Sequence, residues 1–146
     1  MKLILLQGPS HCGKTEIFIK LRETLLSDFK CSELHFESIN KSRDFQSVIK
    51  INNKQIALFS MGDLKGECYN AIIKYLGVDV LVLPQSDGRI SILNGIPMKL
   101  NYNKITGNEP PAHVMLTMTK KTTAEEMTKE EELKLSEIIT ELKKTL

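Results

Sequence analysis

The sequence has few of the features that mark membrane, secreted or nucleic-acid-binding proteins. None of its apolar runs approaches the length of about 18 residues that a spanning helix needs, and the run at residues 1–7 is shorter than the apolar part of a signal peptide. A formal net charge of +2 is too small to indicate nucleic acid or a membrane surface as a partner. The three cysteines, Cys12, Cys31 and Cys68, are odd in number and lack metal-site spacing, which is typical of reduced thiols. We therefore expect a cytoplasmic protein.

Arginine is also scarce, which bears on the kind of enzyme that the chain can be. Its arginines are Arg22, Arg43 and Arg89, and the first falls within a predicted helix. A small-molecule kinase usually carries an arginine-rich lid, because arginine clamps the phosphoryl group during transfer. Arg89, which follows a predicted strand at 79–83, is the best candidate for such a clamp. The scarcity of arginine disfavours a kinase without excluding one.

What is present is the composition of an ordinary globular domain, with 41% hydrophobic and 26% charged residues. The length of 146 residues fits a single domain spanning 1–146. Apolar periodicity predicts, in order, a buried strand at 3–6, a helix through 15–29, a short strand near 34–36, strands at 45–51 and 55–59, a helix at 64–76, a strand at 79–83, a hairpin at 90–100, a strand at 113–118 and a helix from about 124. Strands that alternate with helices predict a three-layer α/β domain with a mainly parallel sheet, to which the hairpin at 45–59 adds an antiparallel member.

Turn and capping residues predict several boundaries. Asn52 and Asn53 tolerate positive φ and predict a tight hairpin between the strands at 45–51 and 55–59. Pro84 is expected to end the strand at 79–83. Thr123, with Glu126 three residues later, predicts a capping box for the last helix. The buried face predicted for the helix at 64–76 consists of Tyr69, Ile72, Ile73 and Leu76.

The clearest motif is Gly8-Pro-Ser-His-Cys-Gly-Lys-Thr, which matches G-x-x-x-x-G-K-[ST] at every specified position and lies between a predicted strand and a predicted helix. Gly8 and Gly13 let the backbone curl so that successive N–H groups point at phosphate oxygens. Lys14 supplies a positive charge between the β- and γ-phosphates, and Thr15 offers a hydroxyl to Mg²⁺. The following helix aims its positive N-terminus at the same place.

This segment resembles the Walker A motif of the P-loop NTPase superfamily. The resemblance implies a three-layer P-loop fold and Mg²⁺-dependent binding of ATP or GTP, with Lys14 as a catalytic residue and Thr15 as a metal ligand. It implies nucleotide contacts from the whole loop and the first helical residues, namely Gly8, Pro9, Ser10, His11, Cys12, Gly13, Lys14, Thr15 and Glu16. Cys12 fills a variable position, where we favour packing over a reactive thiol.

P-loop proteins also need a carboxylate near the end of a neighbouring strand to hold the metal. The Walker B pattern has its Asp directly after an apolar run, and this chain has Ser60 at that position. Asp63, three residues later, is our candidate for a catalytic and metal-shell residue, with a cap for the helix at 64–76 as the alternative. Asp44, just ahead of the hairpin, is a weaker candidate for contacting the ligand from the opposite side.

The order of loop, helix, polar segment, hairpin and Gly-containing loop resembles that of small GTPases. The polar segment at 31–43 is then the expected first switch, with Ser38 or Ser42 where a metal-binding Thr is usual. Guanine selection needs [NT]-K-x-D after a later strand, but Thr119 and Lys120 are followed by Thr122 at the Asp position. The base is therefore left open between adenine and guanine.

We predict a Mg²⁺-dependent NTP-binding protein that acts as a small NTP hydrolase or nucleotide switch. Two alternatives stay open. A small-molecule or nucleotide kinase would transfer the γ-phosphate to an acceptor. A non-catalytic nucleotide-binding module would report the nucleotide state to a protein partner, with the helix from about 124 as its docking element.

Overall fold

The computed structural model describes residues 1–9, 12–61, 65–86 and 113–146. Over these ranges the chain forms an α/β domain with a six-stranded mixed sheet and three helices. Several sequence predictions lie outside the described residues, namely those on Ser10, His11, Asp63, Arg89 and the hairpin at 90–100. Within the described ranges, no helix is long and apolar enough to cross a membrane.

The sheet has the strand order β2-β3-β4-β5-β1-β6. The strands are β1 (Lys2–Gly8), β2 (Cys31–Ser38), β3 (Phe45–Ile51), β4 (Lys54–Phe59), β5 (Val80–Ser86) and β6 (His113–Thr117). β4, β5, β1 and β6 are parallel neighbours, whereas β3 pairs antiparallel with both β2 and β4. Because β3 runs against β4, it begins at the edge of the sheet where the four parallel strands end. The segment before β3 and the segments after β1 and β4 therefore share one edge.

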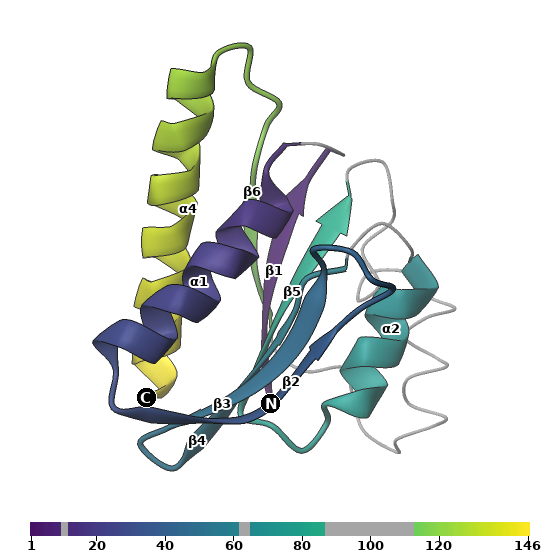
Figure 1. The fold of residues 1–146 in the computed structure, drawn as a ribbon, viewed down its shortest axis with the longest axis vertical. Helices are drawn as coiled ribbons and strands as arrows, with labels where there is room; N and C mark the ends of the chain where they lie inside the picture. Colours follow the sequence, from purple (N-terminus) through teal and green to yellow (C-terminus); the bar gives the residue numbers. More distant parts are fainter. Residues whose placement is uncertain (10–11, 62–64, 87–112) are drawn as a thin grey trace.

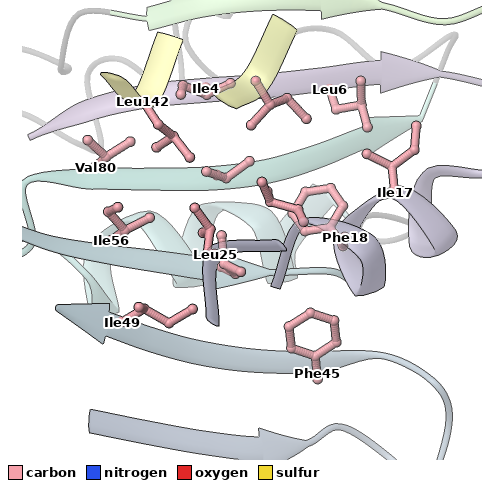
Figure 2. Packing of buried hydrophobic residues seen from close by; sticks show 14 of the residues in the cluster. Ile4, Leu6, Ile17, Phe18, Leu25, Phe45, Ile49, Ile56, Val80 and Leu142 are labelled. Atoms are coloured by element: carbon pink, nitrogen blue, oxygen red, sulfur yellow. The ribbon is translucent and has the colours of Figure 1, made fainter. Parts of the chain in front are cut away.

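The sheet is covered on both faces, which makes three layers around two hydrophobic cores. Helices α1 (Lys14–Asp28) and α4 (Ala124–Thr145) lie on one face, and α2 (Lys65–Lys74) lies on the other (Figure 1). The four central residues of β1 are fully buried, because this strand has covered neighbours on both sides. Ile4 and Leu6 pack with α1 and α4 (Figure 2), whereas Leu3 and Leu5 belong to the core under α2. This apolar strand fixes the point from which the loop at 8–15 departs.

Two predictions of local geometry are confirmed. Asn52 and Asn53 have φ values of 50° and 64° and connect β3 to β4 in a tight antiparallel turn. Thr123 caps α4, since its Oγ1 accepts a hydrogen bond of 3.2 Å from the backbone N–H of Glu126. This is one half of the predicted capping box, because the Glu126 carboxylate accepts from Thr122 Oγ1 at 3.4 Å.

β2 is longer than the sequence predicted. It spans eight residues, not the short piece expected near 34–36. Its side chains are mostly exposed at the edge of the sheet, and a register shift between Glu33 and His35 interrupts the alternation of its faces. An edge strand that is stabilised by pairing with β3, with little burial of its own, leaves only a weak periodic signal in the sequence.

Two further expectations were wrong. Pro84 does not end the third parallel strand but lies inside β5, opposite Leu6 of β1. β4 pairs with β5 only as far as Val82, so that one side of the Pro84 backbone has no described strand beside it. Of the face predicted for the helix at 64–76, Ile72 is buried and Ile73 packs against the core under α2, whereas Leu76 lies beyond the end of α2 and is 39% exposed.

Candidate functional site

The loop between β1 and α1 closes tightly over its own first residue. A Cβ atom on Gly8 would lie 2.7 Å from Cys12 Sγ and 3.0 Å from Met118 Cβ, closer than packed side chains allow. Gly13 is the N-cap of α1 and has a φ of 99°, in the left-handed region that favours glycine. A Cβ on Gly13 would also lie 3.1 Å from Glu131 Oε1 of α4. The backbone of this loop therefore requires both glycines of the motif.

Lys14 begins α1, and its side chain turns back into the loop. It is only 8% exposed, and its ammonium group donates to the Gly8 carbonyl at 2.6 Å and to the Pro9 carbonyl at 2.8 Å. A buried charge without such partners would be costly, so these carbonyls hold the ammonium in place. Lys14 is also the first residue of α1, and the first N–H groups of a helix have no partner within it. The loop thus concentrates hydrogen-bond donors and positive charge at one point.

Cys12 fills space inside the loop. Its side chain is 4% exposed, and its sulfur lies 3.8 Å from Lys14 Nζ. Burial raises the pKa of the Cys12 thiol above its ordinary value, and this effect outweighs the opposing attraction of the Lys14 charge. A buried, protonated thiol supports the packing interpretation of Cys12 over the reactive one.

A carboxylate lies beside the motif threonine, and it is Asp44. Thr15 Oγ1 donates to Asp44 Oδ1 at 3.4 Å, which is long for a hydroxyl–carboxylate bond. Both groups are therefore loosely engaged with each other, and their lone pairs stay available to a cation. Asp44 is partly exposed at the sheet edge, immediately before β3. The structure thus gives the sequence's weaker candidate a contact with the motif.

Ser60 fixes the position of that carboxylate. It directly follows β4, where the Walker B pattern has Asp, and it is 3% exposed. Its hydroxyl donates to Asp44 Oδ1 at 3.1 Å and accepts from the Phe45 backbone N–H at 2.8 Å. The Ser60 N–H in turn donates to the Phe45 carbonyl at 3.0 Å. Ser60, after β4, therefore holds the Asp44 carboxylate, immediately before β3, in place.

Thr15 Oγ1 and Asp44 Oδ1 are oxygens that could coordinate a hard cation such as Mg²⁺. Among the described residues, no group of three or more His, Cys, Asp or Glu side chains could hold a metal ion. Mg²⁺ is usually bound through one or two carboxylates together with substrate phosphates and water, and a hydroxyl at this loop position completes that set. Thr15 and Asp44 fit these requirements, whereas Asp63 lies outside the described residues.

The other side of the loop is bordered by α4. Glu131, whose carboxylate lies against Gly13, forms an ion pair of 2.8 Å with Lys20 of α1, and that contact raises the pKa of Lys20. Glu130 accepts from the Thr119 N–H at 3.3 Å and pairs with Lys121 at 3.2 Å. These contacts tie the segment after β6, which includes the exposed Lys120, to α4.

Most of the expected first switch is regular structure. Residues 31–38 of the segment at 31–43 form β2, which pairs with β3. Ser42, one candidate for a metal-binding position, donates its hydroxyl to the Ile39 carbonyl at 2.8 Å and accepts from the Asp44 N–H at 3.1 Å. The loop at 39–44 is the part that remains between strands, and it delivers Asp44 to Thr15.

Comparison with known proteins gives no relative: no protein-family model, no curated protein and no solved structure matches the chain.

Proposed function

We propose that the chain is a P-loop protein that binds a nucleoside triphosphate with Mg²⁺ and hydrolyses it slowly, as a small NTP hydrolase or nucleotide switch. The observation that carries the proposal is the buried Lys14 ammonium, held by the Gly8 and Pro9 carbonyls one residue away from the Thr15–Asp44 pair. Positive charge, helix N–H groups and a metal-binding pair of oxygens then meet at one point, which is what a triphosphate with its cation requires.

Each residue has a distinct role in this proposal. Gly8 and Gly13 shape the loop so that its N–H groups surround the phosphates. Lys14 reaches the β- and γ-phosphates, and Thr15 and Asp44 hold Mg²⁺, with Asp63 as a further candidate for the metal shell. When bound, the cation neutralises charge on the phosphate oxygens. The loop at 39–44, which carries Asp44, is the described segment that we expect to respond to loss of the γ-phosphate.

The experiment measures affinity for ATP and for GTP by titration calorimetry, with Mg²⁺ and with EDTA, on wild type and Lys14→Ala. A hydrogen bond to a charged group contributes about 1.5–3 kcal/mol, so we expect Lys14→Ala to weaken binding by about 10–100-fold. Lys30→Ala is the matched control, because Lys30 is an exposed lysine after the far end of α1. Lys14→Gln, which keeps hydrogen-bond donors for the two carbonyls, separates loss of charge from loss of folding.

Unchanged affinity in folded Lys14→Ala and Lys14→Gln would refute the proposal. Phosphate release from ATP or GTP without any acceptor then separates a hydrolase or switch from a non-catalytic module, which would bind the nucleotide tightly without turnover.

A further inference from the structure

A cavity of about 270 Å³ lies between α1 and the β2–β3 pair, beside the proposed metal site. It is lined by Ile19, Arg22, Phe36, Ser38, Ser42, Arg43 and Phe45. Its volume is near the lower end of the range for small-molecule sites, which are usually apolar cavities with a few polar groups. None of the roles proposed above for the phosphate loop uses these residues.

Residues on both walls of the cavity are close in the chain to the proposed metal-binding pair, Thr15 and Asp44. On the sheet side, Arg43 and Phe45 are the immediate neighbours of Asp44 in the chain. On the helix side, Thr15, Ile19 and Arg22 are spaced by four and three residues, which places them on one stripe of α1. A molecule in the cavity therefore lies next to the Thr15–Asp44 pair, where the γ-phosphate is expected.

The cavity has a flat, preformed wall. The Phe36 ring stacks on the buried Phe45 ring with a centroid separation of 5.8 Å and an interplanar angle of 27°. The Arg22 guanidinium lies 4.2 Å from the Phe36 centroid, and two hydrogen bonds of 2.7 Å to Glu33 hold it there. Phe36 is nevertheless 46% exposed. Because Arg22 and Phe45 both lie against the Phe36 ring, the wall offers a planar ligand the plane of the guanidinium and the exposed part of the ring.

The rim of the cavity is polar and carries one loosely held cation. The Ser38 and Ser42 side chains lie at this rim. Arg43 forms an ion pair with Glu16 of α1, but the two side chains are 67% and 37% exposed. An exposed pair of this kind contributes little stability, so Arg43 can turn to a stronger anion at low cost.

We propose that this cavity binds the phosphoryl acceptor, a nucleoside or nucleoside monophosphate that stacks on the Phe36–Arg22 wall and, when it carries a phosphate, pairs with Arg43. The assignment rests on the proposed function, because it takes the γ-phosphate to lie at the loop. An acceptor hydroxyl oxygen forms a bond to the γ-phosphorus, and the bond from that phosphorus to the β–γ bridging oxygen breaks. The electron pair leaves with the nucleoside diphosphate, and the hydroxyl proton passes to solvent water. Hydrolysis is the same displacement with water in the cavity.

The test titrates unlabelled nucleosides and nucleoside monophosphates into protein that is saturated with Mg²⁺ and a non-hydrolysable triphosphate analogue, by calorimetry and ligand-detected NMR. Transfer from ATP and GTP is followed separately by ³¹P NMR. Phe36→Ala removes the stacking ring and should weaken binding of both acceptor types by about 5-fold or more. Arg43→Gln should weaken only the monophosphates. Leu34→Ala is the control, because Leu34 is a similarly exposed apolar residue of β2 that does not line the cavity.

Three results would overturn the acceptor site while leaving triphosphate binding intact. The first is that no nucleoside or monophosphate binds the wild-type complex. The second is that Phe36→Ala and Leu34→Ala have equal effects on acceptor binding. The third is that Phe36→Ala weakens triphosphate binding as much as acceptor binding, which would assign the cavity to the base of the triphosphate. Absence of triphosphate binding by wild type would instead refute the function on which the inference rests.

Discussion

Replacing Asp44 by Asn removes the negative charge from the proposed metal site and so tests whether that charge binds the cation. The amide oxygen of Asn can still accept hydrogen bonds from Thr15 and Ser60, so both contacts that Asp44 Oδ1 now makes can be kept. Thermal stability should therefore stay close to that of wild type, and the substitution should weaken binding of the cation. Removing a group that orients or neutralises a bound metal typically costs about 10–100-fold in metal affinity, which is about 1.4–2.7 kcal/mol.

Without Mg²⁺, the same substitution should change the affinity for nucleotide in the opposite direction. The Asp44 carboxylate repels a bare triphosphate, so Asp44→Asn should bind Mg²⁺-free nucleotide at least as tightly as wild type. The ratio of the dissociation constant in EDTA to that in Mg²⁺ should therefore fall, because the constant in Mg²⁺ rises and the constant in EDTA stays the same or decreases. A mutation that merely loosened the fold would raise both constants together.

The assay is calorimetric titration of ATP and GTP in Mg²⁺ and in EDTA, with melting curves for every variant. Asp28→Asn is the control, because it removes an exposed carboxylate at the opposite end of α1. A wild-type ratio in folded Asp44→Asn would refute the assignment of Asp44 to the metal. Asp63→Asn belongs in the same series: an unchanged ratio would leave Asp63 as a helix cap, and a lowered one would place it in the metal shell as well.

Three further variants test the surroundings of the site. Gly8→Ala should lower the free energy of unfolding in urea by about 1–3 kcal/mol, because its Cβ would lie 2.7 Å from Cys12 Sγ. Adding Cys12→Ala should recover part of that loss. Equal urea midpoints for wild type and Gly8→Ala would contradict the loop geometry. The Arg22 guanidinium lowers the pKa of Glu33, so the carboxylate stabilises the fold above the ordinary glutamate pKa and loses that effect as pH falls through the lowered value. The stability difference between wild type and Glu33→Gln should therefore shrink below about pH 4, and a difference that stays constant in acid would rule the explanation out. Thr123→Ala should lower the unfolding free energy by about 1 kcal/mol through loss of the α4 cap, with no change expected if the Glu126 N–H finds another acceptor.

The sequence predicted those elements whose signals are local. The run at 3–6, the glycines of the loop and the Asn52–Asn53 turn each encode their conformation within a few residues, and the structure has all three. The ends of β2 could not be predicted from local signals, because this strand is stabilised by pairing with β3 and not by an apolar face of its own. The insertion of β5 between β4 and β1 also has no local signal, since strand order depends on contacts between distant segments.

The contact of Asp44 with Thr15 could have been predicted from the sequence. A tight hairpin brings the start of its first strand to the end of its second, so residue 44 and Ser60 must lie together. Ser60 in turn ends a parallel strand on the side where the phosphate loop lies. The familiar pattern places the carboxylate after the strand at 55–59 and so indicates Asp63, whereas Asp44 lies across the hairpin from the end of that strand.

The position of β1 between β5 and β6 also affects how the chain folds. β2, β3 and β4 pair with sequence neighbours, whereas Lys2 of β1 lies opposite Val80 and Leu3 lies opposite His113. Contacts between such distant residues form slowly, because a long loop must close first. During synthesis β1 can therefore pair with β5 only after residue 86 has been made, and with β6 only after residue 117. Gly8 packs against Met118, which follows β6, so this contact of the loop forms only after that closure, and until then the apolar β1 segment is prone to aggregation.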